Sequence, residues 1–136
     1  MIQEKLKRYV DILNDIPTDE EKYGWLMLFG KKSMDHVDQL KLDKFEVPGC
    51  QTRTWIIPGK DDRPTLHFIA DSDALISKGL VCMLADIFSE STPKEILDFE
   101  RKNLEDLRLD VLLTPGRRNG AHNMLQKIRE YAVEYS

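Results

Sequence analysis

Cysteine is scarce in this chain. Its 136 residues contain two cysteines, Cys50 and Cys82, and they do not form a Cys-x-x-Cys pair. This excludes a small disulfide-rich secreted fold and the common zinc-site spacings. The sequence therefore predicts two free thiols in a reducing cytosol, each of which needs its own explanation.

The sequence also lacks a long hydrophobic run and an excess of positive charge. The first residues, MIQEKLKRYVDIL, carry charges throughout, which is typical of neither a signal peptide nor a membrane span. Twenty Lys and Arg face 24 Asp and Glu, a net charge of −4, so no general attraction to nucleic acid or anionic lipid is expected. We expect a cytoplasmic protein whose partner is a protein or a small molecule, with no membrane or nucleic-acid binding.

Cofactor-binding motifs are missing as well. There is no glycine-rich phosphate loop and no spaced set of metal ligands, so we expect no bound metal and no cofactor of the chain's own. With 41% hydrophobic and 32% charged residues, the composition is that of a globular protein. The length predicts a single domain over residues 1–136.

Helical periodicity appears in several separate stretches. Apolar residues at helical spacing predict helices near 2–13, from a Thr18–Glu21 capping pattern to Gly30, and over 73–89, the last being the expected core helix. Asp71, Ser72 and Asp73 are expected to cap this core helix. A second capping box, Thr92-Pro93-x-Glu95, predicts a short helix to Phe99. Residues 101–111 could be helix or loop, 114–120 resemble a turn cluster, and a final helix is expected over 124–135.

Alternation replaces helical spacing between these helices. Residues 51–57 and 65–70 are rich in β-branched and aromatic residues around the loop sequence PGKDDRP, and residues 44–47 alternate in polarity. These stretches predict a small antiparallel sheet of three strands. His67 alternates with Leu66 and Phe68, so its side chain is expected on the opposite face of the sheet.

Cys50 follows directly on a Pro-Gly pair. Pro48 and Gly49 suit the two central positions of a type II turn, because proline fixes the first φ and glycine accepts the positive φ that follows. A thiol after such a turn is accessible, and an accessible thiol near positive charge, such as Arg117 or Arg118, is a candidate nucleophile. From the local pattern alone, burial of a small apolar residue at the start of a strand remains the commoner explanation.

The other candidate groups have simpler explanations. Cys82 lies among Val81, Met83 and Leu84 in the core-helix pattern, which favours a structural residue. The three histidines, at positions 36, 67 and 122, are scattered along the chain. Any of them could act as a base for Cys50, although exposed polar side chains are the commoner case.

Four motifs together resemble one known family. The stretches VPGCQTRTWI (47–56), ADSDALISKGL (70–80), Thr92-Pro93 and LTPGRRNG (113–120) are similar in order and spacing to the SufE family of sulfur acceptors. The resemblance covers nearly the whole chain. It implies an α+β fold with helices packed on one side of a small curved antiparallel sheet, the SufE/NifU (IscU-like) fold.

The resemblance also implies a function. Cys50 would accept sulfane sulfur as a persulfide from a pyridoxal-phosphate cysteine desulfurase of the SufS or CsdA type. It would also stimulate that enzyme and pass the sulfur to a SufBCD-like complex for iron–sulfur cluster assembly. The pyridoxal phosphate belongs to the partner. The family pattern further places Pro48, Gly49, Gln51, Asp73 and Arg117 as support for the acceptor loop or for partner binding.

Two other functions remain open at this stage. Cys50 with a histidine could form a cysteine hydrolase or thioltransferase, which would turn over a substrate without a partner. A cysteine-independent adaptor would only bind the desulfurase. A sulfur-transfer accessory protein, in contrast, is used stoichiometrically and is not an independent enzyme.

Overall fold

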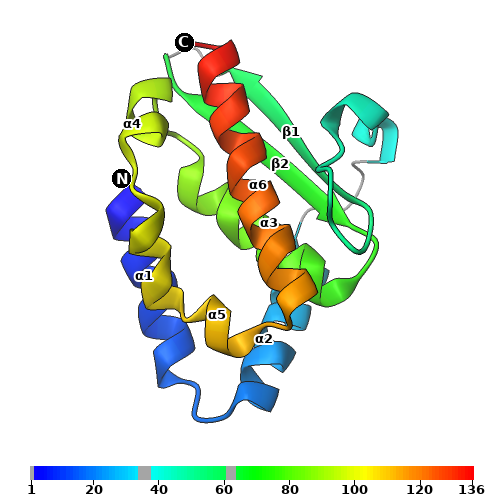
Figure 1. Ribbon diagram of the computed structural model, residues 1–136, viewed down its shortest axis with the longest axis vertical. Helices are drawn as coiled ribbons and strands as arrows, with labels where there is room; N and C mark the ends of the chain where they lie inside the picture. Colours follow the sequence, from blue (N-terminus) through cyan, green and yellow to red (C-terminus); the bar gives the residue numbers. More distant parts are fainter. Residues whose placement is uncertain (1, 34–37, 61–63) are drawn as a thin grey trace.

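The structure is a computed structural model that describes residues 2–33, 38–60 and 64–136. Helices and strands succeed one another along the chain as shown in Figure 1. The α-helices are α1 (Ile2–Asp15), α2 (Asp19–Lys32), α3 (Leu75–Phe88), α4 (Pro93–Asp98), α5 (Leu109–Leu112) and α6 (Pro115–Glu134); the strands are β1 (Thr54–Lys60) and β2 (Leu66–Ser72); and the 3-10 helices are η1 (Asp38–Leu40), η2 (Asp43–Phe45) and η3 (Arg101–Leu107).

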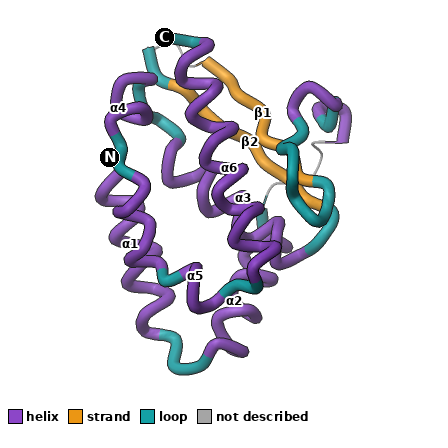
Figure 2. The backbone as a smooth tube through the Cα atoms, viewed as in Figure 1, coloured by secondary structure: helices purple, strands orange, loops and turns teal. Residues whose placement is uncertain are grey.

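The two strands form an antiparallel sheet against which the α-helices pack from one side (Figure 2). Their register runs from Thr54 opposite Ser72 to Lys60 opposite Leu66. Leu66 and Phe68 are buried and His67 is exposed, as the alternation predicts. The α+β fold with helices on one side of a small antiparallel sheet is thus confirmed.

Two details of the predicted sheet are wrong. Residues 58–60 continue β1 instead of forming a loop, because β1 is an edge strand, where proline is tolerated. Residues 44–47 are not a third strand: they hold the end of η2 and one isolated bridge between Glu46 and Trp55. Lys41 explains this, since its Nζ lies 4.6 Å from the Trp55 ring centroid and 3.4 Å from Asp71, which folds the segment over the sheet.

Helix α3 occupies the centre of the core, in contact with α1, α2, α6 and both strands. The side chains at its predicted apolar positions Leu80, Met83, Leu84, Ile87 and Phe88 are almost completely buried. Helix α2 crosses α3 where Gly30 meets Gly79; a Cβ on Gly79 would overlap the backbone of Leu26. The two glycines therefore allow the helix backbones to touch.

The predicted helix starts are largely confirmed. Thr92 and Glu95 form the complete capping box of α4, and the Thr18 side chain accepts a hydrogen bond from the Glu21 amide at the start of α2. Residues 101–111, for which the sequence left two possibilities, form η3 and most of α5. None of the helices in the described part of the chain combines the length and the apolarity that a bilayer crossing requires.

The segment 114–120 is not a turn cluster. Pro115 is the first residue of α6, and the helix runs without interruption through Gly116 and Gly120. Proline is favoured at the first position of a helix, where the missing amide is not needed. The glycines that suggested a turn have another role, which lies at the candidate site.

Candidate functional site at Cys50

Cys50 lies in a short loop with a fixed base. The Val47 amide donates a hydrogen bond of 2.7 Å to the Thr54 carbonyl, which closes the loop just before β1. Pro48 and Gly49 form a turn at its tip, and Gly49 has φ +79°, as the Pro-Gly pair predicts. Cys50 follows as a half-buried residue, so the turn presents the thiol beyond the end of the sheet.

Residues 48–51, which we expect to form the acceptor loop, rest on the first turns of α6. Three successive loop residues contact one face of that helix. Gly49 lies against Asn123, the Cys50 thiol donates to the Gly120 carbonyl across 3.8 Å, and the Gln51 side chain covers Gly116. Residues 116, 120 and 123 recur at spacings of four and three, so they form one stripe along the helix. Because the two glycines have no side chains, the loop can approach the helix backbone along this stripe.

Hydroxyl groups line the region behind the loop. The Thr54 and Ser72 hydroxyls are 3.0 Å apart, and the Thr52 hydroxyl lies 3.4 Å from Ser72 and 3.3 Å from Ser77. Thr54 and Ser72 are buried in the sheet. Of these hydroxyls, that of Thr54 interacts with the Cys50 sulfur, and the others hold the Thr54 side chain in a polar network.

The electrostatics of the loop hold Cys50 in its neutral form. Burial raises the pKa of the Cys50 thiol above its ordinary value, the Thr54 hydroxyl opposes this in part, and the Glu46 carboxylate raises the pKa further. The same carboxylate forms an ion pair of 2.9 Å with Arg53. A thiol reacts as the thiolate, so the reactive form of Cys50 is disfavoured in this position.

No cation lies against the Cys50 sulfur among the residues that the structure describes. Arg117, expected near the loop, is half-buried at the start of α6 and makes no hydrogen bond or ion pair with the rest of the described chain. Arg118 lies on a different face of α6. The idea that one of these arginines stabilises the thiolate is therefore not realised in this conformation.

Asp73 does not cap α3, contrary to the prediction. The cap residue is Ala74, whose methyl side chain cannot accept a hydrogen bond from the free amides at the helix start. The Asp73 carboxylate is 54% exposed and lies 3.9 Å from Lys41. The buried Asp71 lies between Lys41 and Lys78, at 3.4 and 3.5 Å, because a buried carboxylate is stable only when paired. Asp73 thus stays available at the surface beside Arg53. The Asp73 amide donates a hydrogen bond to the Arg53 carbonyl.

The remaining candidates lie away from Cys50. His67 and His122 are exposed and neither is hydrogen-bonded to the thiol, while His36 is outside the described residues. Cys82 donates a weak hydrogen bond of 3.5 Å to the Ala70 carbonyl, and burial raises its pKa. Within 2–33, 38–60 and 64–136, no three His, Cys, Asp or Glu side chains gather as metal ligands would.

The sequence reasoning missed the residues that receive the loop. Gly116, Gly120 and Asn123 contact Gln51, Cys50 and Gly49. The two glycines belong to the motif that suggested only a turn, and Asn123 was not singled out. The signal was present in the spacing of two glycines four apart inside an otherwise helical stretch, which marks a close approach of another segment.

Comparison with known proteins decides the family. The family model described as "SufE: Fe-S metabolism associated domain" matches residues 7–132. The chain belongs to the SufE family. This membership associates it with iron–sulfur metabolism, and the match includes the acceptor loop and the stripe on α6.

A solved structure supports the fold of this SufE-family chain. The solution structure of a hypothetical protein from Thermus thermophilus matches with a TM-score of 0.75 at 18% identity, over 96% of this chain and 95% of that one. At that identity the similarity concerns the fold alone.

Proposed function

We propose that this SufE-family chain accepts sulfur as a persulfide on Cys50 from a pyridoxal-phosphate cysteine desulfurase and delivers it to iron–sulfur cluster assembly. The observation that carries the proposal is the mounting of Cys50: a thiol at the tip of a loop whose base is fixed by the Val47–Thr54 hydrogen bond and whose tip rests on α6. A sulfur acceptor needs this reach, because its thiol must enter the active site of another protein.

The transfer itself requires few groups. The Cys50 thiolate attacks the outer sulfur of the partner's cysteine persulfide, and a new sulfur–sulfur bond forms. The bond within the partner's persulfide breaks, and its electrons leave with the partner's cysteine as a thiolate. The Cys50 proton must be lost beforehand. The sulfane sulfur keeps its oxidation level throughout, so no metal or further cofactor on this chain is needed.

The raised pKa of Cys50 fits a carrier that reacts only with its partner. Burial and the Glu46 carboxylate disfavour the thiolate while the loop lies on α6. Moving the loop outward would take the thiol away from both influences and into the charges of a docked partner. Pro48, Gly49 and Gln51 would shape and release the tip, whereas the exposed Asp73 and the half-buried Arg117 would contact the partner.

The experiment measures the sulfur on the protein. The chain is incubated with a cysteine desulfurase, pyridoxal phosphate and L-cysteine, and its intact mass is recorded. We expect a gain of one sulfur atom on Cys50, absent in Cys50→Ser and retained in Cys82→Ser. An adduct mapped to Cys82, or binding without any adduct, as an adaptor would give, would overturn the proposal. Turnover of a substrate without the partner would indicate a cysteine hydrolase instead.

A further inference from the structure

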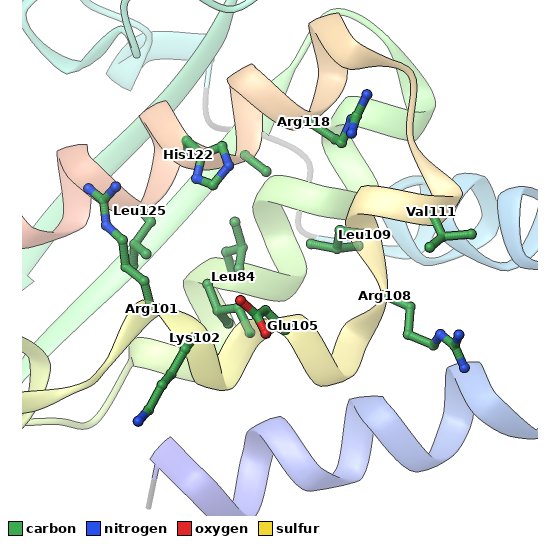
Figure 3. A pocket seen from close by; sticks show the side chains of 12 residues that line it. Leu84, Arg101, Lys102, Glu105, Arg108, Leu109, Val111, Arg118, His122 and Leu125 are labelled. Atoms are coloured by element: carbon green, nitrogen blue, oxygen red, sulfur yellow. The ribbon is translucent and has the colours of Figure 1, made fainter.

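A cavity of about 560 Å³ lies on the far side of α6 from Cys50. It opens between α6 on one side and η3 with α5 on the other, and Leu84 of α3 forms its floor (Figure 3). Leu104, Leu109 and Leu125 provide further apolar wall. The volume is within the range of pockets that hold small organic molecules.

The position on α6 separates the cavity from the acceptor loop. Arg118, Ala121 and Leu125 line the cavity, whereas Gly116 and Gly120 face the loop. At 3.6 residues per turn the two sets point about half a turn apart. A ligand in the cavity would therefore leave Cys50 uncovered, and neither site depends on the other.

The rim of the cavity is positively charged. Four of its lining residues are cationic, at positions 101, 102, 108 and 118, and one, Glu105, is acidic, although the whole chain carries −4. Lys102 is offset by Glu100 at 3.1 Å. Arg101 donates to the oxygen of the neutral Gln126 amide at 2.8 Å and forms no ion pair with the side chains that the structure describes. The sign of the rim is thus opposite to that of the molecule.

Arg118 supplies an independent observation. Its Nε is buried and has no hydrogen-bond partner in the part of the chain that the structure describes. Buried donors are almost always paired, so an exception calls for an acceptor. A guanidinium is best satisfied by a carboxylate or phosphate oxygen.

Apolar and charged groups occupy different depths. Figure 3 shows Leu84, Leu109 and Leu125 near the centre, with the side chains of Lys102 and Arg108 extending away from it. A matching ligand has an apolar body and one anionic end. A cationic ligand would meet like charges at the rim, and a wholly polar anion would leave the leucines in contact with water.

We propose that this cavity binds a small amphipathic carboxylate, with its apolar body on Leu84, Leu109 and Leu125 and its carboxylate at the arginine-bearing rim. A rotation of the Arg118 side chain would bring its buried, unpaired Nε to that carboxylate. Glu105 lowers the affinity by repelling the same carboxylate. This site is distinct from the sulfur-acceptor function proposed above, and its failure would leave that function unaffected.

The test uses octanoate as the probe and octylammonium as its control of opposite charge. The ¹⁵N-labelled full chain is titrated with each, and amide shifts are followed by NMR. We expect saturable shifts with octanoate at Leu84, Ala121 and Leu125 and none of comparable affinity with octylammonium. Equal affinity for both probes would refute the preference for a carboxylate, and shifts that do not saturate would show that the cavity is no binding site.

Two substitutions of opposite sign sharpen the result. Arg118→Gln should weaken octanoate binding about twofold to fivefold, and Glu105→Gln should strengthen it by a similar factor, as expected for partly exposed charges. Arg53→Gln, on the other side of α6, should change nothing. The same spectra report whether each variant is folded. Unchanged affinity in both Arg118→Gln and Glu105→Gln would refute the role of the charged rim.

Discussion

Because Gly120 contacts the Cys50 thiol, substitutions at position 120 of α6 should change the reactivity of that thiol. A Cβ at position 120 would stand 3.5 Å from the Cys50 sulfur, which is ordinary van der Waals contact. Gly120→Ala should therefore leave the thiol in place, and should stabilise the helix by up to about 1 kcal/mol because alanine is the better helix former. Gly120→Val adds two methyl groups within reach of the sulfur and should push the thiol away from α6.

The expected consequence in Gly120→Val is faster alkylation of the Cys50 thiol. Burial is the main cause of the raised pKa of Cys50, so a displaced thiol should recover a lower pKa. Well below the pKa, each unit of decrease gives about ten times more thiolate. In a Cys82→Ser background, we expect Gly120→Val to be alkylated several-fold faster than Gly120→Ala at neutral pH.

The assay is alkylation by iodoacetamide, followed by intact mass at a series of pH values. The parent protein and Gly120→Ala should share a profile whose midpoint lies above that of free cysteine, and Gly120→Val should be shifted to lower pH. Addition of a cysteine desulfurase should accelerate the alkylation of Cys50 in the parent protein. A parent midpoint at or below that of free cysteine, or identical profiles for the two variants, would refute the sheltered-thiol reasoning.

Three further predictions concern stability and are measured by urea unfolding. Lys5 donates 2.9 Å hydrogen bonds to carbonyls at the C-terminal end of α3, so Lys5→Met should lower the unfolding free energy by about 1–2 kcal/mol. Lys7→Met, on the exposed face, should leave the unfolding free energy nearly unchanged. Equal effects of the two substitutions would contradict this prediction. Tyr131→Phe removes a 2.7 Å hydrogen bond to a buried carbonyl of β1 and should lower the unfolding free energy by about 1–2 kcal/mol. An unchanged unfolding free energy would mean that water replaces the hydroxyl. Gly79→Ala places a Cβ into the backbone of Leu26 and should lower the unfolding free energy by more than about 2 kcal/mol, although alanine is the better helix former. A stabilised variant would show that α2 and α3 can move apart at their crossing.

Local signals predicted the elements that depend on local chemistry. The Thr92–Glu95 capping box forms as expected, because both partners lie within one turn. The apolar face of α3 is buried as expected, since one side of an amphipathic helix has to leave water. The Pro48–Gly49 turn likewise needs only its own two residues to set its dihedrals.

The errors arose where a distant contact decides the structure. Residues 44–47 alternate like a strand, but Lys41 pairs with Asp71 and holds the preceding segment over Trp55. Gly116 and Gly120 suggested a turn, whereas they lie inside α6 and leave room there for the side chains of residues 50 and 51, which are far away in sequence. A single sequence carries the glycines but not the partner that explains them.

The hydrogen bond between the Val47 amide and the Thr54 carbonyl also sets the length of a tether. It leaves six residues, 48–53, between two anchored points. Half of such a loop, fully extended at about 3.3–3.6 Å per residue, lets its tip stand roughly 10 Å from the base. Cys50 can therefore reach no further than about 10 Å from the base of the loop, and under the proposed function a donor would have to bring its sulfur to within that distance of the sheet.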